Sequence, residues 1–255
     1  MVYVPLGIKT DYSLLKSIIK IDDLINMAVK NKFNTIGILD NNLFSLAEFY
    51  LKCQKNKIKP IVGLEVLLNE YPIYLYPKNN RGLRNLFLIH DLIFERELTT
   101  NDLELHSDNI ILVLPYDSYR LYKELNSIFN EVYLSYENDQ EKQNALLISK
   151  EVLFLNKVLY FNPSDADLIN YLKMIELGEN SENYSLENYQ TNRLLSDSQV
   201  ITEDKETTIK FSSLIDLNWV NKKNYLPHYE TKNKDNYEFL KELSIFGLKK
   251  RLNDK

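Results

Sequence analysis

The sequence predicts an α/β fold in which consecutive β-α units build a parallel sheet. Over residues 3–68, short apolar runs rich in β-branched residues alternate with longer runs whose apolar residues recur at helical spacing. The chain has 255 residues, of which 44% are hydrophobic, so one substantial core can form without a division into two domains. In parallel β/α folds, functional side chains gather at the carboxyl ends of the strands.

The first three strands are predicted in this opening stretch. They cover residues 4–8, 35–39 and 60–68, and the helices between them cover 21–32 and 43–56. The carboxyl ends of these strands carry Gly7-Ile8-Lys9, Leu39-Asp40-Asn41 and Gly63-Leu64-Glu65. These three ends form the expected functional edge of the sheet.

The pattern continues after residue 68. Further strands are predicted at 71–77, 109–114, 131–136 and 157–161. Helices are predicted at 83–89, 117–129, 139–152, 203–216 and 237–251, with a polar surface loop at 179–192. An extended connector at 226–236 precedes the last helix.

The helix after Pro163 can be predicted in most detail. Ser164 is expected to be its N-cap and Gly178 its left-handed stop. The stripe that faces the core is expected to consist of Leu168, Leu172 and Ile175. Asp117 is expected to cap the helix predicted over 117–129.

Composition argues against several classes of protein. A net charge of −5 and a pI near 5.4 argue against a surface that grips nucleic acid by its phosphates. The sequence has no apolar run of eighteen residues and no secretory signal pattern, so we expect neither a membrane span nor export. The single cysteine, Cys53, excludes an internal disulfide and suits the reducing cytoplasm, where we expect this protein.

Common catalytic motifs do not occur in the sequence. It contains no P-loop, no GxGxxG, no GxSxG and no paired CxxC. The three histidines, His90, His106 and His228, have no second His or Cys at ligand spacing, and we expect surface or capping roles for them. Cys53 falls in the middle of a predicted helix and is expected to be a packed thiol.

Several phrases resemble a known family. DYSLL, KIDDL, AEFY and IKPIVGLEV in the opening stretch, and later YPKNNRGLRNLF and NPSDA, are similar to the N-terminal PHP (polymerase and histidinol phosphatase) domain of bacterial DNA polymerase III alpha subunits. This resemblance implies an irregular PHP-type parallel β/α barrel, followed by the start of a helical segment. Residues 1–222 would form the PHP-like domain, and 223–255 the connector and the first helix of the following polymerase region.

The metal ligands of that family are mostly replaced. The family carries HxHxxxS, TDH and GxE at the three strand ends, and only Asp40 and Glu65 survive at the positions compared. The positions where the family has histidines are occupied by Gly7, Lys9, Asn41, Pro72 and Leu159. The family's D-x-H-Y, just before NPSDA, reads Lys157-Val158-Leu159-Tyr160.

We therefore expect no metal in this segment. Our hypothesis is that Lys9 substitutes for the lost cations and forms an ion pair with Asp40 or with Glu65. A reduced, Mg²⁺-like site on Asp40 and Glu65 is the alternative, although two carboxylates without an imidazole would bind weakly.

The resemblance also implies a function for the parent protein. That protein would be a DNA-directed DNA polymerase, a nucleotidyltransferase that acts on primer-template DNA and deoxynucleotides, with its Mg²⁺ in a polymerase domain C-terminal to Lys255. The present segment would be catalytically inactive, bracing that domain and docking other replisome subunits. Two alternatives are a stand-alone metal-dependent PHP phosphoesterase or 3′-5′ exonuclease, and a stand-alone interaction module. The helix at 237–251 discriminates, because a self-contained domain should bury its apolar face.

Overall fold

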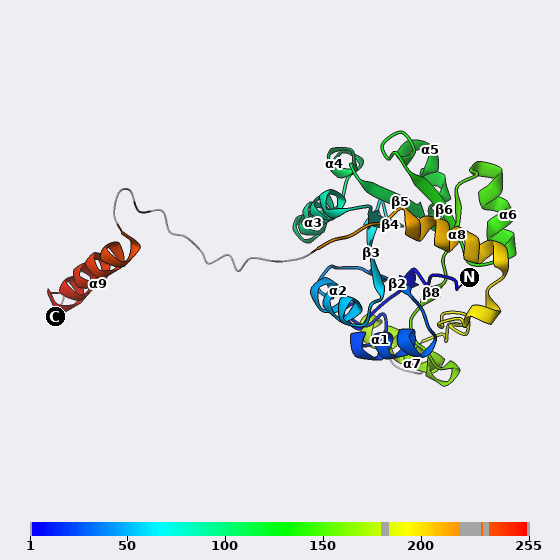
Figure 1. Ribbon diagram of the computed structural model, residues 1–255, viewed down its shortest axis with the longest axis horizontal. Coiled ribbons are helices and arrows are strands. Elements are labelled where there is room, and N and C mark those ends of the chain that lie inside the picture. Colours follow the sequence, from blue (N-terminus) through cyan, green and yellow to red (C-terminus); the bar gives the residue numbers. More distant parts are fainter. Residues whose placement is uncertain (1, 180–183, 220–230, 232–234, 254–255) are drawn as a thin grey trace. The chain divides into compact units, whose positions relative to one another are not determined.

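The computed structural model describes residues 2–179, 184–219, 231 and 235–253. The chain divides into two compact units, Met1–Asn218 and Trp219–Lys255. All strands of the described residues lie in the first unit, which Figure 1 shows as a ring of helices around the sheet. The connector expected at 226–236 lies mostly outside the described residues, as does His228.

The described part of the first unit holds one eight-stranded sheet, in the order β7-β6-β5-β4-β3-β2-β1-β8. Its strands are β1 Gly7–Ile8, β2 Thr35–Asp40, β3 Lys59–Leu68, β4 Tyr71–Pro77, β5 Ile110–Leu114, β6 Val132–Tyr136, β7 Val152–Phe154 and β8 Lys157–Val158. Neighbouring strands are parallel except at β4, which is antiparallel to both β3 and β5. The β/α class is thus confirmed, with a mixed rather than a wholly parallel sheet.

The two edge strands of the sheet are neighbours in the sequence. Only Leu155 and Asn156 separate β7 from β8, so the chain ties one edge to the other and the sheet curls into a partial barrel. Lys9 extends this seam, because its backbone N–H donates to the carbonyl of Val158 at 2.9 Å. This curled, PHP-type partial barrel is the predicted fold class.

Helices surround the sheet. They are α1 Ile21–Lys30, α2 Leu46–Lys55, α3 Asn80–Glu95, α4 Thr100–His106, α5 Tyr122–Leu125, α6 Asp139–Ile148, α7 Ala166–Leu177 and α8 Thr202–Ser213, with 3-10 turns η1 Tyr116–Leu121, η2 Pro163–Asp165 and η3 Asp197–Gln199. Phe211 of α8 packs edge-on against the rings of Tyr76 and Tyr133. Because Tyr133 lies near the start of β6, α8 covers the amino end of the barrel and leaves the carboxyl ends of the parallel strands as its mouth.

Three local predictions were wrong. The helix expected at 117–129 is the 3-10 turn η1 followed by a single turn, α5, so Asp117 lies inside η1 rather than at a cap. The helix expected at 139–152 ends at Ile148, because Val152 begins an edge strand that the sequence did not predict. Ser164 lies within η2, and Asp165 occupies the N-cap position of α7 without a side-chain cap.

The core-facing side of α7 was also mispredicted. Of the predicted stripe, Leu168 is 44% exposed and Ile175 is 65% exposed, and only Leu172 packs against the buried cluster. The helix buries the face that carries Ala166, Ile169 and Met174. A hydrophobic cluster of Tyr160, Ala166 and Ile169 selects that face. The left-handed stop at Gly178 is confirmed by its φ of 67°.

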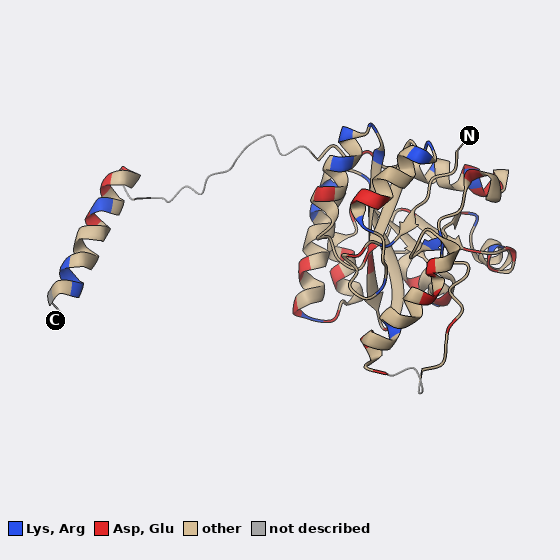
Figure 2. Cartoon of the chain, turned by 90° about the horizontal axis from the view of Figure 1, so that it is seen from below, with Lys and Arg blue, Asp and Glu red and all other residues tan. Residues whose placement is uncertain are grey.

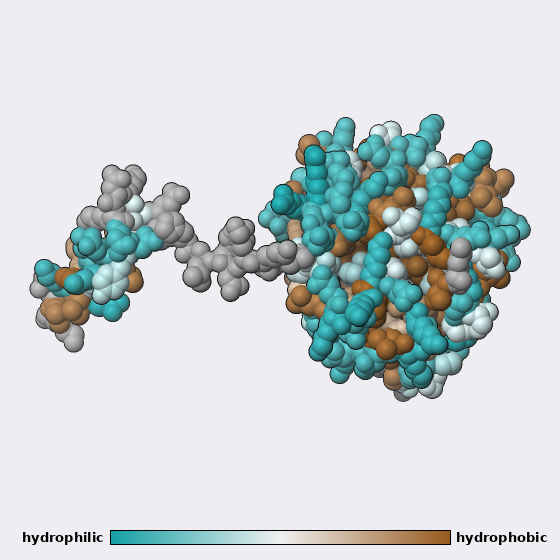
Figure 3. Space-filling model, viewed as in Figure 1, coloured by the Kyte–Doolittle hydropathy of each residue, from teal (hydrophilic) through white to brown (hydrophobic). Residues whose placement is uncertain are grey.

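Charges and apolar groups are mixed over the surface. Figure 2 shows acidic and basic residues interspersed along the helices of the first unit, and Figure 3 shows hydrophobic residues scattered among hydrophilic ones. In the second unit, α9 Asn236–Asn253 exposes Leu240, Leu243, Phe246 and Leu248. No helix within the described residues is long and apolar enough to cross a membrane.

Candidate functional site

The mouth of the barrel brings Lys9 and Glu65 together. Lys9 directly follows β1, and its Nζ lies 3.0 Å from Oε1 of Glu65 in β3, with the lysine side chain only 9% exposed. The contact is an ion pair rather than an aligned hydrogen bond, because Lys9 Nζ has no hydrogen-bond partner among the described residues. An ammonium group therefore occupies the place where the family resemblance puts metal ligands.

Asp40 does not take part in this ion pair. The register pairs Asp40 of β2 with Leu64 of β3, and successive residues of a strand point to opposite faces, so Asp40 and Glu65 face opposite sides of the sheet. Asp40 is fully buried. Lys9 and Asp40, although both follow or end strands at the mouth, belong to separate clusters.

Four donors satisfy the Asp40 carboxylate instead. Oδ1 accepts the backbone N–H of Thr10 and the hydroxyl of Ser13, each at 2.7 Å. Oδ2 accepts the hydroxyls of Thr10 and Ser45, also at 2.7 Å. A carboxylate offers about four lone-pair sites, so this set leaves none for a cation. Asp40 thereby ties the loop after β1 to the start of α2.

The other positions where the family resemblance puts histidines have different surroundings. A Cβ on Gly7 would lie 2.5 Å from the carbonyl oxygen of Asn156, so the close approach of β1 to the β7–β8 seam requires glycine. Leu159 packs against the cluster around Tyr160. Asn41 is exposed, with its side-chain oxygen accepting from Asn42.

Pro72 is the remaining substituted position. It lies in β4 opposite Leu67, and its carbonyl accepts the hydroxyl of Ser118. This contact uses only the backbone of Pro72, whose ring offers neither donor nor ligand.

These residues do not fit a metal ion. No group of three or more His, Cys, Asp or Glu side chains that could hold one occurs within the described residues. Of the two surviving acidic positions, Asp40 is saturated by hydrogen bonds and Glu65 faces an ammonium group. A cation at Glu65 would have to displace Lys9, whose positive charge repels it.

The other half of the mouth contains a small polar pocket of about 70 Å³. It is lined by Tyr74, Pro115, Tyr116, Asp117, Ser135, Glu137, Glu141, Leu155 and Lys157. The hydroxyl of Tyr74 is fully buried and finds no hydrogen-bond partner in the described part of the chain. Lys157 Nζ lies 6.0 Å from the centroid of the Tyr74 ring.

Glu137 is electrostatically unusual in this pocket. Burial raises the pKa of the Glu137 carboxyl group from 4.5 to about 7. The positive charge of Lys157 lowers this pKa, and the negative charge of Glu141 raises it. Burial also raises the pKa of Tyr74 well above its ordinary value, assisted by the charges of Glu65 and Glu137. Tyr74 thus lies between the two charged halves of the mouth.

The sequence did not single out most of these partners. Thr10 and Ser45 satisfy Asp40, and Tyr74 and Glu137 line the pocket, yet none belongs to a pattern that identifies a site. Among the donors to Asp40, only Ser13 could be connected to the site from the sequence, as the last residue of the family's HxHxxxS phrase. Lys157 was noted as a replacement for an acid, and the register places it opposite Gly7.

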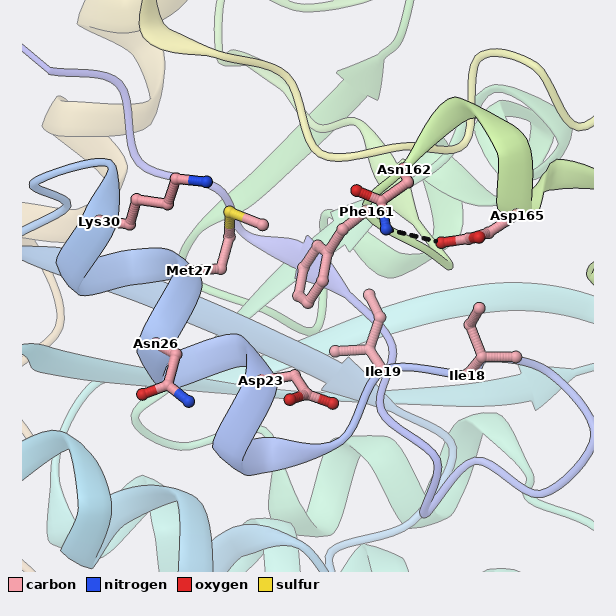
Figure 4. A pocket seen from close by; sticks show the side chains of 9 residues that line it. All are labelled: Ile18, Ile19, Asp23, Asn26, Met27, Lys30, Phe161, Asn162 and Asp165. Carbon is pink, nitrogen blue, oxygen red and sulfur yellow. Dashed lines mark hydrogen bonds between the residues drawn. The ribbon is translucent and has the colours of Figure 1, made fainter.

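A larger groove lies away from the mouth. It has a volume of about 370 Å³ and lies between α1 and the η2 turn, where Met27, Ile19 and Phe161 form its apolar part and Asp23, Lys30 and Asp165 its charged part (Figure 4). None of the strand-end residues discussed above lines it. Its mixed charges and open shape single out no ligand.

Two of the predicted non-functional residues are buried. Cys53 is a packed thiol, as expected, and burial raises its pKa to about 12. The surface or capping role expected for His90 was wrong, because the residue is only 8% exposed. His90 packs edge-on against the rings of Phe44 and Phe94, which also contact each other.

Comparison with known proteins agrees with the fold. The PHP domain family matches residues 6–244. A protein of Ureaplasma parvum serovar 3 named DNA polymerase III subunit alpha is 28% identical over 268 residues, which cover 98% of this chain and 25% of that protein.

Proteins with the same name from Staphylococcus aureus strains Mu50 and N315 are 29% identical over 180 residues, covering 67% of this chain and 16% of theirs. The chain therefore spans a quarter or less of the length of these relatives. The family match over residues 6–244 is decisive: the chain belongs to the PHP domain family.

Proposed function

We propose that this chain is the N-terminal segment of a replicative DNA-directed DNA polymerase, the DNA polymerase III alpha subunit, and that its own PHP domain is structural and non-catalytic. The observation that carries the second part is the state of the two surviving acidic positions. Asp40 is saturated by four donors, and Glu65 is paired with Lys9.

Chemistry supports the loss of phosphoesterase activity. Metal ions in such sites polarise the phosphoryl oxygen and lower the pKa of a bound water until it attacks as hydroxide. A lysine ammonium supplies positive charge but has no open coordination position for water. Lys9 can thus hold the mouth together electrostatically without generating a nucleophile.

The polymerase function is inferred from the relatives' names and the extent of the match. Primer-template DNA, deoxynucleotides and the polymerase Mg²⁺ would be bound in a region beyond residue 255. The assignment of residues 223–255 to a connector and the first helix of that region stays a prediction. It is supported by α9, which exposes large apolar residues such as Leu240, Phe246 and Leu252, because a helix apolar on several sides is normally buried. Docking of other replisome subunits on this segment is part of the same proposal.

Two measurements test the proposal. An immunoblot of native extract, with an antibody raised against this chain, should reveal a band several times larger than 30.1 kDa. A band at 30.1 kDa would withdraw the polymerase assignment and favour a stand-alone interaction module.

The second measurement addresses catalysis by the purified chain. With Mn²⁺ or Zn²⁺ added, it should release no phosphate from a phosphomonoester and no nucleotide from a mismatched primer end. Metal-dependent hydrolysis would overturn the non-catalytic role and support a phosphoesterase or 3′-5′ exonuclease. An E65Q variant is the matched control, because contaminating hydrolase activity would persist in it.

A further inference from the structure

Lys9, at a position where the family has a histidine, and Lys157, at the acid position of the family's D-x-H-Y, lie on the same side of the sheet. Lys157 of β8 is in register with Gly7 of β1, and Lys9 is two residues further along, so both side chains point to the same face. Glu65 and Tyr74 are directly opposite one another across β3 and β4 and therefore also share a face. The contact between Lys9 and Glu65 shows that this common face is the interior of the mouth.

Each lysine faces a glutamate. Lys9 contacts Glu65 directly at 3.0 Å. Lys157 and Glu137 line the same small pocket but form no ion pair within 4.0 Å among the described residues. Tyr74 also lines this pocket, and its buried hydroxyl has no hydrogen-bond partner among the described residues. A polar cavity of about 70 Å³ with several polar groups on its wall is the kind of space that ordered water fills.

We propose that Lys157 and Glu137 form a second lysine–glutamate unit of the mouth, bridged by water that also satisfies Tyr74, and that the unit binds and releases a proton. This inference rests on the proposed metal-free state of the mouth and names a second internal cation for it. The water exchanges hydrogen bonds with all three groups.

The charges around Glu137 support proton exchange near neutral pH. The groups that face it are Tyr74 from β4, Tyr116 and Asp117 from η1, Glu141 from α6 and Lys157 from β8. Burial raises the Glu137 pKa to about 7, and only Lys157 contributes a positive charge among these groups in the pocket lining. The carboxyl group is consequently neutral in mildly acidic solution and charged in mildly basic solution.

The direct test is a carboxyl-detected NMR titration of the full 255-residue chain in EDTA, with the Glu137 signal assigned by its loss in E137Q. The wild-type midpoint should lie near 7. K157M should raise it by about one unit, because a nearby positive charge favours the carboxylate. K157R keeps the charge and should leave the midpoint in place. A wild-type midpoint below 5, or one that K157M does not move, would overturn the proposal.

Stability provides an independent readout. A carboxyl group with a raised folded pKa binds more protons in the folded chain, so stability must fall as pH rises from 4.5 through 7. We expect the wild-type melting temperature to fall by about 5 °C between pH 5.5 and pH 8 relative to E137Q, which lacks the group.

E206Q is the matched control, because Glu206 is exposed on α8, outside the pocket lining, and that variant should follow the wild type. Equal pH slopes in wild type and E137Q would contradict the proposal. Failure here leaves the native size and the hydrolysis assays unaffected, so it can be told apart from failure of the proposed function.

Discussion

The acidic residues Asp40 and Glu137 belong to separate clusters at the carboxyl ends of the strands, and their surroundings differ. Around the fully buried Asp40, four direct hydrogen bonds of 2.7 Å satisfy both carboxylate oxygens. Glu137 instead lines a small pocket with Lys157 and Tyr74, and no ion pair within 4.0 Å joins it to Lys157 among the described residues. The comparison shows two surroundings in which an acidic side chain is occupied without a metal ion: hydrogen-bond donors saturate Asp40, and lysine charges lie near Glu65 and Glu137.

The largest expected effect comes from changing Asp40, whose carboxylate is saturated by hydrogen bonds. D40N keeps the shape of the side chain but replaces one carboxylate oxygen, a hydrogen-bond acceptor, with an NH2 group, which is a donor. Two of the groups that donate to Asp40 then lose their acceptor. We expect the free energy of unfolding to drop by about 4 kcal/mol, measured by urea denaturation. Asp91, whose side chain is 76% exposed, supplies the control D91N, which should cost less than about 0.5 kcal/mol. A loss below about 1 kcal/mol in D40N would contradict the view that Asp40 holds the loop after β1 against the start of α2.

A substitution at Gly7, where β1 approaches the β7–β8 seam, should destabilise the fold nearly as much. In G7A the new Cβ would lie 2.5 Å from the backbone oxygen of Asn156. Because backbone must shift to relieve this contact, we expect a loss of about 3 kcal/mol in the same denaturation experiment.

The matched glycine is Gly247 in α9, where a Cβ meets nothing within 4 Å. G247A should be neutral or favour the helix by up to about 1 kcal/mol. Similar losses in both variants would show that the seam at Gly7 imposes no special constraint.

The Lys9–Glu65 pair should have an intermediate effect. K9M leaves the partly buried Glu65 carboxylate without its cation, and we expect a loss of about 2 kcal/mol and a lower melting temperature. The comparison variant is K16M, since Lys16 pairs with Glu176 in a contact where both side chains are about a third exposed. K16M should cost about 0.5 kcal/mol or less. An unchanged melting temperature in K9M would mean that the lysine does not hold the mouth together.

The smallest expected effect comes from a single donor to Asp40. S45A removes one of four hydroxyl or amide donors while three remain, so we expect a loss of about 1 kcal/mol. Ser213 bonds only within its own exposed helical turn, and S213A should be close to neutral. If S45A lowered the free energy of unfolding as much as D40N does, the three remaining donors would not be enough to satisfy Asp40, contrary to the account.

Much of this fold could be predicted because its signals are local. Apolar runs and turn residues located β2, β3, β4 and the helices α1 and α2 to within a few residues. The strand β7 escaped prediction because its three residues continue an apolar helical run, and only pairing with β6 separates the two. The buried face of α7 was mispredicted for a related reason, since both sides of that helix are apolar and the cluster around Tyr160 decides between them.

The candidate site was predictable in part. The strand-end rule and the family resemblance located Lys9, Asp40 and Glu65 at the mouth. Which of the two acids faces Lys9 depends on strand register, and a shift of one residue would reverse the answer. Tyr74 and Glu137 reach the pocket through β4 and the end of β6, and their meeting with Lys157 depends on how the sheet curls.

The central claim is that lysines, not metal ions, provide the positive charge of this mouth. Isothermal titration calorimetry of the untagged chain with Mn²⁺ at pH 7.5 tests it most directly, with K9M as the variant that removes the resident cation. The account predicts no saturable binding by the wild-type chain at millimolar Mn²⁺. Stoichiometric binding by the wild type that E65Q abolishes would contradict it.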